Sequence, residues 1–274
     1  VLAVQFGIDY HDRDILRRLV SDEHYLELVA AGHITGKPHM GIKARTGATG
    51  RGIVYSILAT IGARHLDGSF RPEIELGRDE RLLLQRAAEM GERYFLAKHG
   101  SSALSEEEWR RLDDTVYPKL LEDARVIVQG AGKVGSSVML ELARYGVKIV
   151  AIADRDGAIT GQDIPVDGAL EAVRSGGSVI HTKTGVDRVI SGAEAGAQVL
   201  TMPCDILVPA ALEHAITSHN AGEIQADIIA CGSNGPNTAR AGRMLHSRGV
   251  TVIYDFLANS GGVTASYFEW LRNL

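Results

Sequence analysis

Between Arg125 and the C-terminus, short runs of β-branched and other apolar residues alternate with longer stretches that have helical spacing. The apolar runs predict strands, at residues 125–129, 148–153, 178–181, 205–208, 227–231 and 250–254. Helices are predicted between them, for example at 136–145 and 167–174. Because this alternation is typical of parallel sheets with helices on both faces, the pattern predicts an α/β fold with a doubly wound, Rossmann-like parallel sheet.

The first 120 residues have a different, mainly helical pattern. Apolar positions at helical spacing predict helices at 12–29 and 49–63, and an amphipathic helix between Gly77 and Gly100. We therefore predict an additional, mainly helical N-terminal segment at 1–120 and a sheet domain at 121–274, with the boundary near Leu121.

The residues after Gly100 predict the start of a further helix. Ser105 followed three positions later by Glu108 is a capping box, and the helix it opens should carry Trp109, Leu112 and Val116 on one side. Pro118 is predicted to end this helix, because proline has no N–H to donate within a helix.

Composition narrows the class of protein without naming a function. Hydrophobic residues make up 45% and charged residues 23%, which is ordinary for a globular protein, and a net charge of −5 gives no electrostatic footprint for nucleic acid. Two cysteines and ten histidines without ligand spacing predict neither a disulfide framework nor a metal site. No apolar run is long enough to span a membrane, so we expect a soluble, cytoplasmic protein. Because the first residue is Val1, we expect a chain that either has lost its start or is a piece of a longer one.

The strongest local chemistry is a glycine-rich run between the predicted strand at 125–129 and the helix that follows it. The run is Gly130-Ala131-Gly132-Lys133-Val134-Gly135. In dinucleotide-binding folds the first glycine permits a tight turn, the second lets a pyrophosphate approach the backbone, and the third lets helix and strand pack closely. The alternative is a run of glycines that only shapes the turn between strand and helix.

The predicted strand at 148–153 is followed by two residues that bear on which dinucleotide is bound. Asp154, 19 residues after Gly135, is placed to accept hydrogen bonds from both adenosine ribose hydroxyls, which favours NAD because a 2′-phosphate would be repelled. Arg155 follows directly and, with Lys133, is suited to hold a phosphate, so NADP stays possible.

Further motifs follow one another along the chain in a set order. They are Thr35-Gly-Lys-Pro38, Gly47-Ala-Thr-Gly-Arg-Gly52, Val128–Gly135, Ala153-Asp-Arg-Asp-Gly-Ala158, Cys204–Ala211, Asn234-Gly-Pro-Asn-Thr238 and Asn259–Trp270. Together they resemble the glutamate/leucine/phenylalanine/valine dehydrogenase family. The ending Ser266-Tyr-Phe-Glu-Trp270 resembles the glutamate branch.

The resemblance implies the oxidative deamination of L-glutamate to 2-oxoglutarate and ammonia, or its reverse. A hydride would pass between the substrate Cα and NAD, or NADP. By similarity, this chain would supply the cofactor-binding part, as a homo-oligomer or as part of a larger polypeptide.

The resemblance also implies roles for individual residues. Besides Gly130–Gly135 and Asp154, the cofactor-binding residues would be Thr49, Ala210, Asn234 and Asn259. The substrate would be held by Thr35, Arg45 and Ser266, and Asp9 matches the family's catalytic aspartate only if a gap is allowed.

Each of these residues also has a plainer interpretation. Thr49 could cap its helix, the two asparagines could form turns, and Asp9, Arg45 and Ser266 could be solvated surface residues. Cys231 is interpreted as a small buried residue.

Two observations keep a second function open. No stretch before Thr35 resembles the lysine-bearing substrate lobe of the family, and the 53–125 segment is longer than in family members, which suggests a partner surface or an added lobe. The alternatives are a non-catalytic dinucleotide-binding regulatory or assembly module, and a different Rossmann dehydrogenase.

Overall fold

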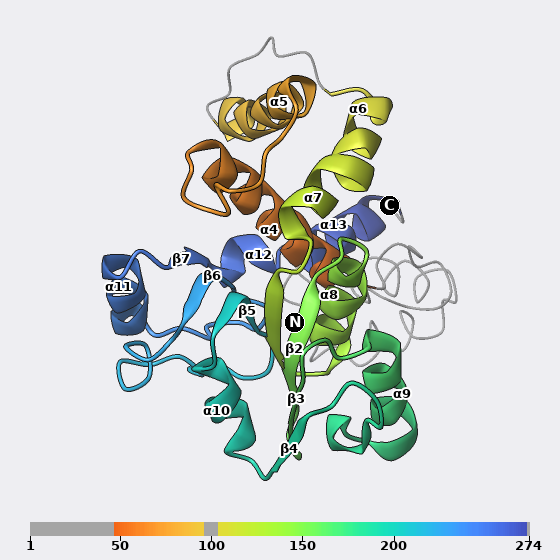
Figure 1. The fold of residues 1–274 in the computed structure, drawn as a ribbon, viewed down its shortest axis with the longest axis vertical. Coiled ribbons are helices and arrows are strands. Elements are labelled where there is room, and N and C mark those ends of the chain that lie inside the picture. Colours follow the sequence, from red (N-terminus) through yellow and green to blue (C-terminus); the bar gives the residue numbers. More distant parts are fainter. Residues whose placement is uncertain (1–46, 96–103, 273–274) are drawn as a thin grey trace, which may run out of the picture. The chain divides into compact units, whose positions relative to one another are not determined.

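A computed structural model describes residues 47–95 and 104–272 of the chain (Figure 1). The chain divides into two compact units, one formed by Thr49–Gly261 and the other by residues 1–48 with 262–274. The first unit contains the whole sheet and the helices before it. The domain boundary near Leu121 stays a prediction, and the helix predicted at 12–29 lies outside the described residues.

The first unit is built on a sheet of seven strands in the order β4-β3-β2-β1-β5-β6-β7. The strands are β1 (Arg125–Gln129), β2 (Lys148–Ala153), β3 (Gly157–Thr160), β4 (Arg188–Ser191), β5 (Cys204–Pro209), β6 (Ala226–Ala230) and β7 (Thr251–Ile253). Strands β2, β1, β5, β6 and β7 are parallel, whereas β3 and β4 add to the β2 edge in antiparallel pairing. The α/β class and the parallel sheet predicted from the sequence are confirmed, with two antiparallel edge strands added.

Helices cover both faces of this sheet, as alternate residues of the central strands show. Val126 and Val128 of β1 pack in one apolar cluster with α8 (Lys133–Ala143) and α9 (Val166–Gly176). Ile127 faces the other way, in a cluster with α10 (Ala195–Leu200) and α11 (Ala239–Ser247). Figure 1 shows these two pairs of helices on opposite sides of the sheet. The sheet is therefore doubly wound, and its strands are apolar on both faces because neither face meets water.

The strand predicted at 178–181 is wrong. Val179–His181 forms a 3₁₀ helix capped by Ser178, whose Oγ accepts a hydrogen bond from the Ile180 N–H at 3.3 Å. The strand that pairs with β2 on this side is instead β3. Because β3 is short and starts at a glycine, the pattern of apolar residues does not predict it.

The helical segment before β1 consists of α4 (Ala48–Leu66), α5 (Arg78–Phe95), α6 (Glu106–Arg111), a π-helical turn η2 (Leu112–Val116) and α7 (Tyr117–Leu121). The capping box at the start of α6 is confirmed: Ser105 Oγ accepts from the Glu108 N–H at 3.2 Å, and Glu108 Oε2 accepts from the Ser105 N–H at 2.8 Å.

Pro118 does not end this helical run, contrary to the sequence prediction. The Tyr117 N–H donates to the Leu112 carbonyl across the π turn, and Pro118 then lies in the first turn of α7. Proline is tolerated in the first turn of a helix, where its fixed φ fits helical geometry. The chain therefore stays helical to Leu121.

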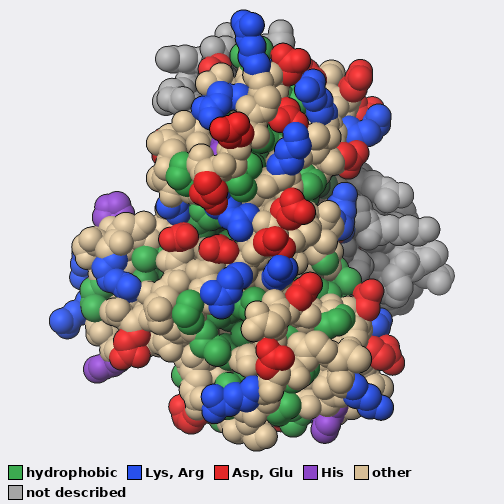
Figure 2. Space-filling model, viewed as in Figure 1, with side chains coloured by type: hydrophobic (Ala, Val, Ile, Leu, Met, Phe, Trp, Pro, Cys, Tyr) green, Lys and Arg blue, Asp and Glu red, His purple; other side chains and the backbone are tan. Residues whose placement is uncertain are grey.

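Two features of the described part concern its surface and its remaining helices. On the face seen in Figure 2, acidic and basic side chains are interspersed rather than separated by sign. Across residues 47–95 and 104–272, α12 (Asp255–Ala258) and α13 (Gly261–Arg272) included, no helix combines the length and apolar character needed to cross a bilayer.

The packing of α8 against the sheet gives a stability prediction. Leu142 is fully buried, with 0% of its surface exposed, whereas Leu140 on the same helix is 46% exposed. We expect Leu142→Ala to lower the free energy of unfolding by about 2–5 kcal/mol, because it removes a packed side chain and leaves a cavity. Leu140→Ala is the matched control and should cost less than about 1 kcal/mol in the same urea titration. Equal losses for the two variants would contradict the packing described here.

Candidate functional site

The candidate site lies where the strand order of the sheet reverses. From β1 the chain adds β2 on one side and later β5 on the other, and Gln129 at the end of β1 pairs with Pro209 at the end of β5. In open α/β sheets, ligands bind outside the carboxyl ends of the strands at such a switch point. The glycine-rich loop continues β1 at this edge, and Ala210 continues β5, with its N–H donating to the Gln129 carbonyl at 2.7 Å.

The three glycines of the loop are needed for different reasons. Gly130 has φ +111°, and a Cβ on it would lie 2.6 Å from the Ala210 carbonyl oxygen. A Cβ on Gly135 would overlap the Gly130 carbonyl oxygen, so α8 can start here only with a glycine. Gly132 differs from both, because a Cβ on it would meet nothing within 4 Å. The backbone at Gly132 therefore borders open space.

The N-terminus of α8 faces this open backbone. The helix starts at Lys133, and its N-cap residue, Gly132, has no side chain that could accept hydrogen bonds from the first-turn N–H groups. Such a helix end carries partial positive charge and binds anions. The Lys133 side chain is exposed, whereas Ala131 is buried and Val134 packs against the core, so these last two residues support the loop.

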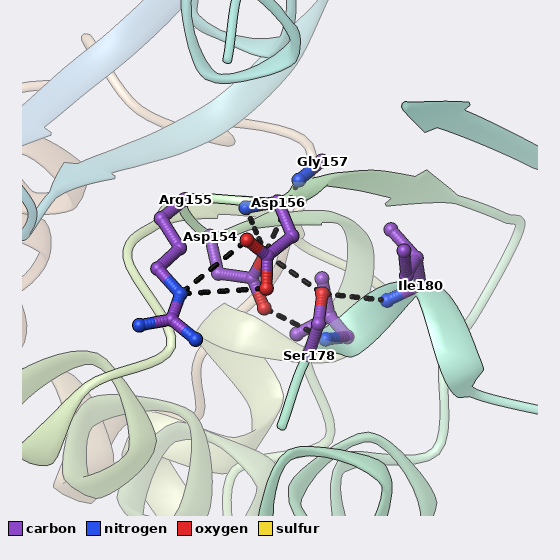
Figure 3. A network of polar contacts seen from close by, with 7 residues as sticks. Asp154, Arg155, Asp156, Gly157, Ser178 and Ile180 are labelled. Atoms are coloured by element: carbon purple, nitrogen blue, oxygen red, sulfur yellow. Dashed lines mark hydrogen bonds and ion pairs between the residues drawn. The ribbon is translucent and has the colours of Figure 1, made fainter. Parts of the chain in front are cut away.

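Asp154, which follows β2, is held tightly by the protein itself (Figure 3). Its Oδ1 accepts from the N–H groups of Asp156 (3.0 Å) and Gly157 (3.2 Å) and from Ser178 Oγ (2.9 Å). Its Oδ2 accepts from the Val179 N–H at 2.7 Å. A carboxylate offers about four acceptor positions, so the acceptor capacity that remains lies mainly on Oδ2.

Arg155 lies next to this network but is not built into it. Its side chain is 84% exposed, and its Nε lies 3.3 Å from a carboxylate oxygen of Asp156. Figure 3 shows the guanidinium pointing away from Ser178. A cation held only by an exposed neighbour can reorient toward an incoming phosphate.

The two asparagines predicted to bind the cofactor contact each other in the part of the chain that follows β6. Asn259 Nδ2 donates to Asn234 Oδ1 at 2.7 Å. The loop that carries Asn234 is pinned by Asp255, whose Oδ2 accepts from the Gly235 N–H at 3.0 Å. The loop also touches the Ala210 segment, since a Cβ on Gly232 would lie 2.8 Å from the Ala210 Cβ. The structure therefore brings Ala210, Asn234 and Asn259 together.

Asn237, in the same loop, has no role assigned from the sequence. Its Nδ2 lies 3.5 Å from Cys231 Sγ, and its buried Oδ1 has no hydrogen-bond partner among the described residues. Cys231 itself is fully buried, as predicted, and burial together with the charge of Asp255 raises the pKa of its thiol to about 12. The thiol is therefore protonated and unreactive at neutral pH.

Thr49 is the second residue of α4 and so is not the residue that caps it. The start of α4 packs tightly on α8, because a Cβ on Gly50 would overlap the Ser137 side chain. This contact holds Thr49 near the helix that carries the glycine-rich loop.

Of the predicted catalytic and substrate residues, only Ser266 lies within the described part of the chain. Asp9, Thr35 and Arg45 lie outside the described residues. Ser266 belongs to the other compact unit, where its Oγ donates to the Gly262 carbonyl within α13 at 2.9 Å.

Comparison with known families agrees with the motifs and the fold. The family model described as Glutamate/Leucine/Phenylalanine/Valine dehydrogenase matches residues 109–274. The chain belongs to this family. The resemblance predicted from the ordered motifs is confirmed.

Individual relatives are glutamate dehydrogenases. An NADP-specific glutamate dehydrogenase of Saccharolobus shibatae is 44% identical over 154 residues, which are 56% of this chain and 35% of the relative. An NAD-specific glutamate dehydrogenase A of Halobacterium salinarum is 43% identical over 158 residues, which are 58% of this chain and 35% of the relative. The chain thus matches only about a third of the length of such relatives.

Solved structures are similar over more of the chain. The hetero-hexameric glutamate dehydrogenase of Thermus thermophilus, in its Leu-bound form, superposes with a TM-score of 0.58 at 26% identity, over 89% of this chain and 44% of that one. A glutamate dehydrogenase of Peptoniphilus asaccharolyticus superposes with a TM-score of 0.51 at 25% identity, over 87% of this chain and 42% of that one.

The Asp154 network predicts a local effect of removing the carboxylate. Asp154→Ala leaves the N–H groups of Asp156, Gly157 and Val179 without their acceptor. Because these are hydrogen bonds to a charged group, hydrogen exchange at the three amides should accelerate by about tenfold or more. Asp156→Ala is the control, because the Asp156 side chain bonds only to its exposed neighbour Arg155 among the described residues. Unchanged exchange in Asp154→Ala would show that the carboxylate does not hold this turn.

Proposed function

We propose that this chain supplies the cofactor-binding part of an NAD(P)-dependent amino acid dehydrogenase that interconverts L-glutamate with 2-oxoglutarate and ammonia. The observation that carries the proposal is the open backbone at Gly132, placed at the N-terminus of α8 and at the switch point of the sheet. Family membership and the names of the relatives support the reaction class.

The loop fits a dinucleotide on structural grounds. A pyrophosphate needs backbone that it can approach closely and N–H groups that point at it, and Gly132 with the first turn of α8 offers both. Gly130 and Gly135 cannot be replaced without a clash, so they set the loop shape, while Lys133 is exposed and adds positive charge beside the phosphates. When bound, the nicotinamide would supply hydride transfer to or from the substrate Cα.

At the adenosine end, the arrangement suits both NAD and NADP. Asp154 keeps acceptor capacity on Oδ2 for one ribose hydroxyl, which is less than the two hydroxyls that a free carboxylate could bind. Arg155 is exposed and can turn to a 2′-phosphate. The relatives include enzymes named NADP-specific and NAD-specific, which agrees with this mixed arrangement.

At the nicotinamide end, Thr49, Ala210, Asn234 and Asn259 would orient the carboxamide and ribose. Asn259 Nδ2 donates a hydrogen bond to Asn234 Oδ1, so this pair is held in place before a ligand binds. Neutral donors and acceptors that are fixed in advance can hold one face of the ring toward the substrate.

The substrate side of the proposal rests on the resemblance alone. Thr35, Arg45 and Ser266 would hold the dicarboxylate, and Asp9 would move a proton. Because the chain matches about 35% of the length of its relatives, we propose that the complete site needs further protein, from a longer polypeptide or from other copies in an oligomer.

Gly132→Val separates dinucleotide binding from folding. A side chain at 132 meets nothing within 4 Å, so the fold should tolerate it, but it would occupy the space of the pyrophosphate. We expect NADH affinity, measured by fluorescence titration, to fall by about tenfold or more while the urea midpoint stays unchanged.

Gly222→Val is the matched control, because Gly222 is exposed and a Cβ there also meets nothing within 4 Å. It should change neither property. If NADH fails to bind the unsubstituted chain at millimolar concentration, or binds Gly132→Val equally well, the proposed site is wrong.

Arg155→Ala tests the adenosine end. Since the guanidinium is exposed and suited to a 2′-phosphate, its removal should weaken NADPH binding by about tenfold and NADH binding by less than about twofold. Lys183→Ala, which removes an exposed cation elsewhere in the same unit, is the control for a general loss of positive charge. Equal effects on the two cofactors would show that Arg155 does not contact the 2′ position.

A further inference from the structure

The helical segment before β1 encloses a cavity of about 460 Å³. Helix α4 contributes one side, including Tyr55 and Leu58, helix α5 contributes Leu84, and Trp109 and Tyr117 come from the helical run that ends at Leu121. All of these residues belong to the unit formed by Thr49–Gly261. A volume of this size lies within the range of small-molecule pockets in proteins.

The space exists because small residues face each other across the two long helices. On α4, Ala59, Gly62 and Ala63 line the cavity, and on α5 Ala87 and Ala88 do so. Ala59 and Ala63 are also exposed, so the cavity opens to solvent along α4. An apolar body can therefore enter without unfolding the helices.

One carboxylate lines this otherwise apolar and aromatic space. Asp113, on the π turn, accepts a hydrogen bond at Oδ1 from the Tyr145 hydroxyl at 3.1 Å. Among the described residues no other group donates to this carboxylate. Arg144 interacts with it electrostatically, but the Arg144 side chain is 58% exposed and hydrogen-bonds to Glu141, so solvent weakens that interaction. Asp113 thus keeps acceptor positions that a ligand can use.

A second polar group in the cavity is the hydroxyl of Tyr117. Tyr117 is only 6% exposed, yet within residues 47–95 and 104–272 its hydroxyl makes no hydrogen bond. Burial, and then the charge of Asp113, raises the pKa of this hydroxyl to about 12, so it stays protonated at neutral pH. No described residue is recorded as a hydrogen-bond partner of this hydroxyl, so it can form a hydrogen bond with a polar ligand group that binds next to it.

We propose that this cavity binds a small organic cation, with an apolar or aromatic body and one ammonium group that pairs with Asp113. The body would pack on the small residues of α4 and α5 and on the rings of Tyr55, Trp109 and Tyr117. Aromatic faces attract cations, and a hydrogen bond between an ammonium group and a carboxylate is stronger than one between neutral groups. The cavity is lined by none of the residues assigned to the dinucleotide, so the proposal does not depend on the function proposed above.

Three probes with the same phenyl body and different charge test the proposal on the full chain. They are 2-phenylethylamine, 2-phenylethanol and phenylacetate, titrated by isothermal calorimetry. We expect the amine to bind at least about tenfold more tightly than the alcohol, and the alcohol more tightly than the anion, because only the ammonium group pairs with Asp113. Equal binding of amine and alcohol, or no saturable binding of the amine at millimolar concentration, would overturn the proposal.

Variants locate the site. Asp113→Asn removes the charge but keeps an oxygen for the Tyr145 hydroxyl, and it should reduce amine affinity about tenfold, to that of the alcohol. Asp114→Asn, at the exposed neighbouring position, makes the same change in net charge and should leave amine binding unchanged. Equal amine affinities in the two variants would place the amine elsewhere.

Two further measurements keep the test decisive if Asp113→Asn does not fold. Ala59→Phe fills the open side of the cavity and should weaken the amine and the alcohol together, while NADH binding stays the same. Amide chemical shifts of the unsubstituted chain should move on amine addition at α4, α5 and the π turn. Shifts confined to the carboxyl edge of the sheet would rule the cavity out.

Discussion

The close contact between backbone atoms at the end of β1 is the constraint on which the rest of the site depends. The Gly135 Cα lies so near the Gly130 carbonyl that no side chain fits, and Gly130 in turn lies against the Ala210 carbonyl with a positive φ. These contacts fix where β1 stops and where α8 starts, and so they aim the amide end of α8 at the edge of the sheet. Of the three glycines, the middle one is the one that the fold leaves open, and this is the position at which we propose that the pyrophosphate binds.

At the proposed adenosine end, Asp154 and Arg155 also differ in how firmly the protein holds them. Asp154 carries a charge that could serve recognition, but four protein donors use most of its acceptor capacity to join the turn after β2 to the 3₁₀ helix at 179–181. In the proposed site, a carboxylate anchored in this way has less acceptor capacity left for two ribose hydroxyls. Arg155 beside it is exposed, and in the proposed site it is the side chain that can adapt to the cofactor. One acidic residue after the second strand is therefore weak evidence for NAD when the same residue also closes a turn.

The helical segment shows how a change in local geometry creates space. The π turn at Leu112–Val116 is followed directly by α7, with Pro118 in its first turn, so the chain stays helical. Asp113 on the π turn lines the cavity. Small residues on α4 and α5 keep the facing helices from filling that side. Among the described residues, the pocket is lined by aromatic rings, the Asp113 carboxylate and the Tyr117 hydroxyl, the set on which we base the proposal of a cationic ligand.

The sequence by itself determined the parts whose causes are local. Alternating apolar runs predicted the parallel strands, the Ser105 and Glu108 pair predicted the start of α6, and the glycine spacing predicted the turn from β1 to α8. Tertiary structure decided the parts that depend on residues far apart in the chain. Ser178 reaches Asp154 across 24 positions, which turned a predicted strand into a capped 3₁₀ helix, and Asn259 reaches Asn234 across 25. A pattern of neighbouring residues records which face of an element is apolar, but it cannot record which distant donor will reach a given acceptor, because that depends on how the elements pack.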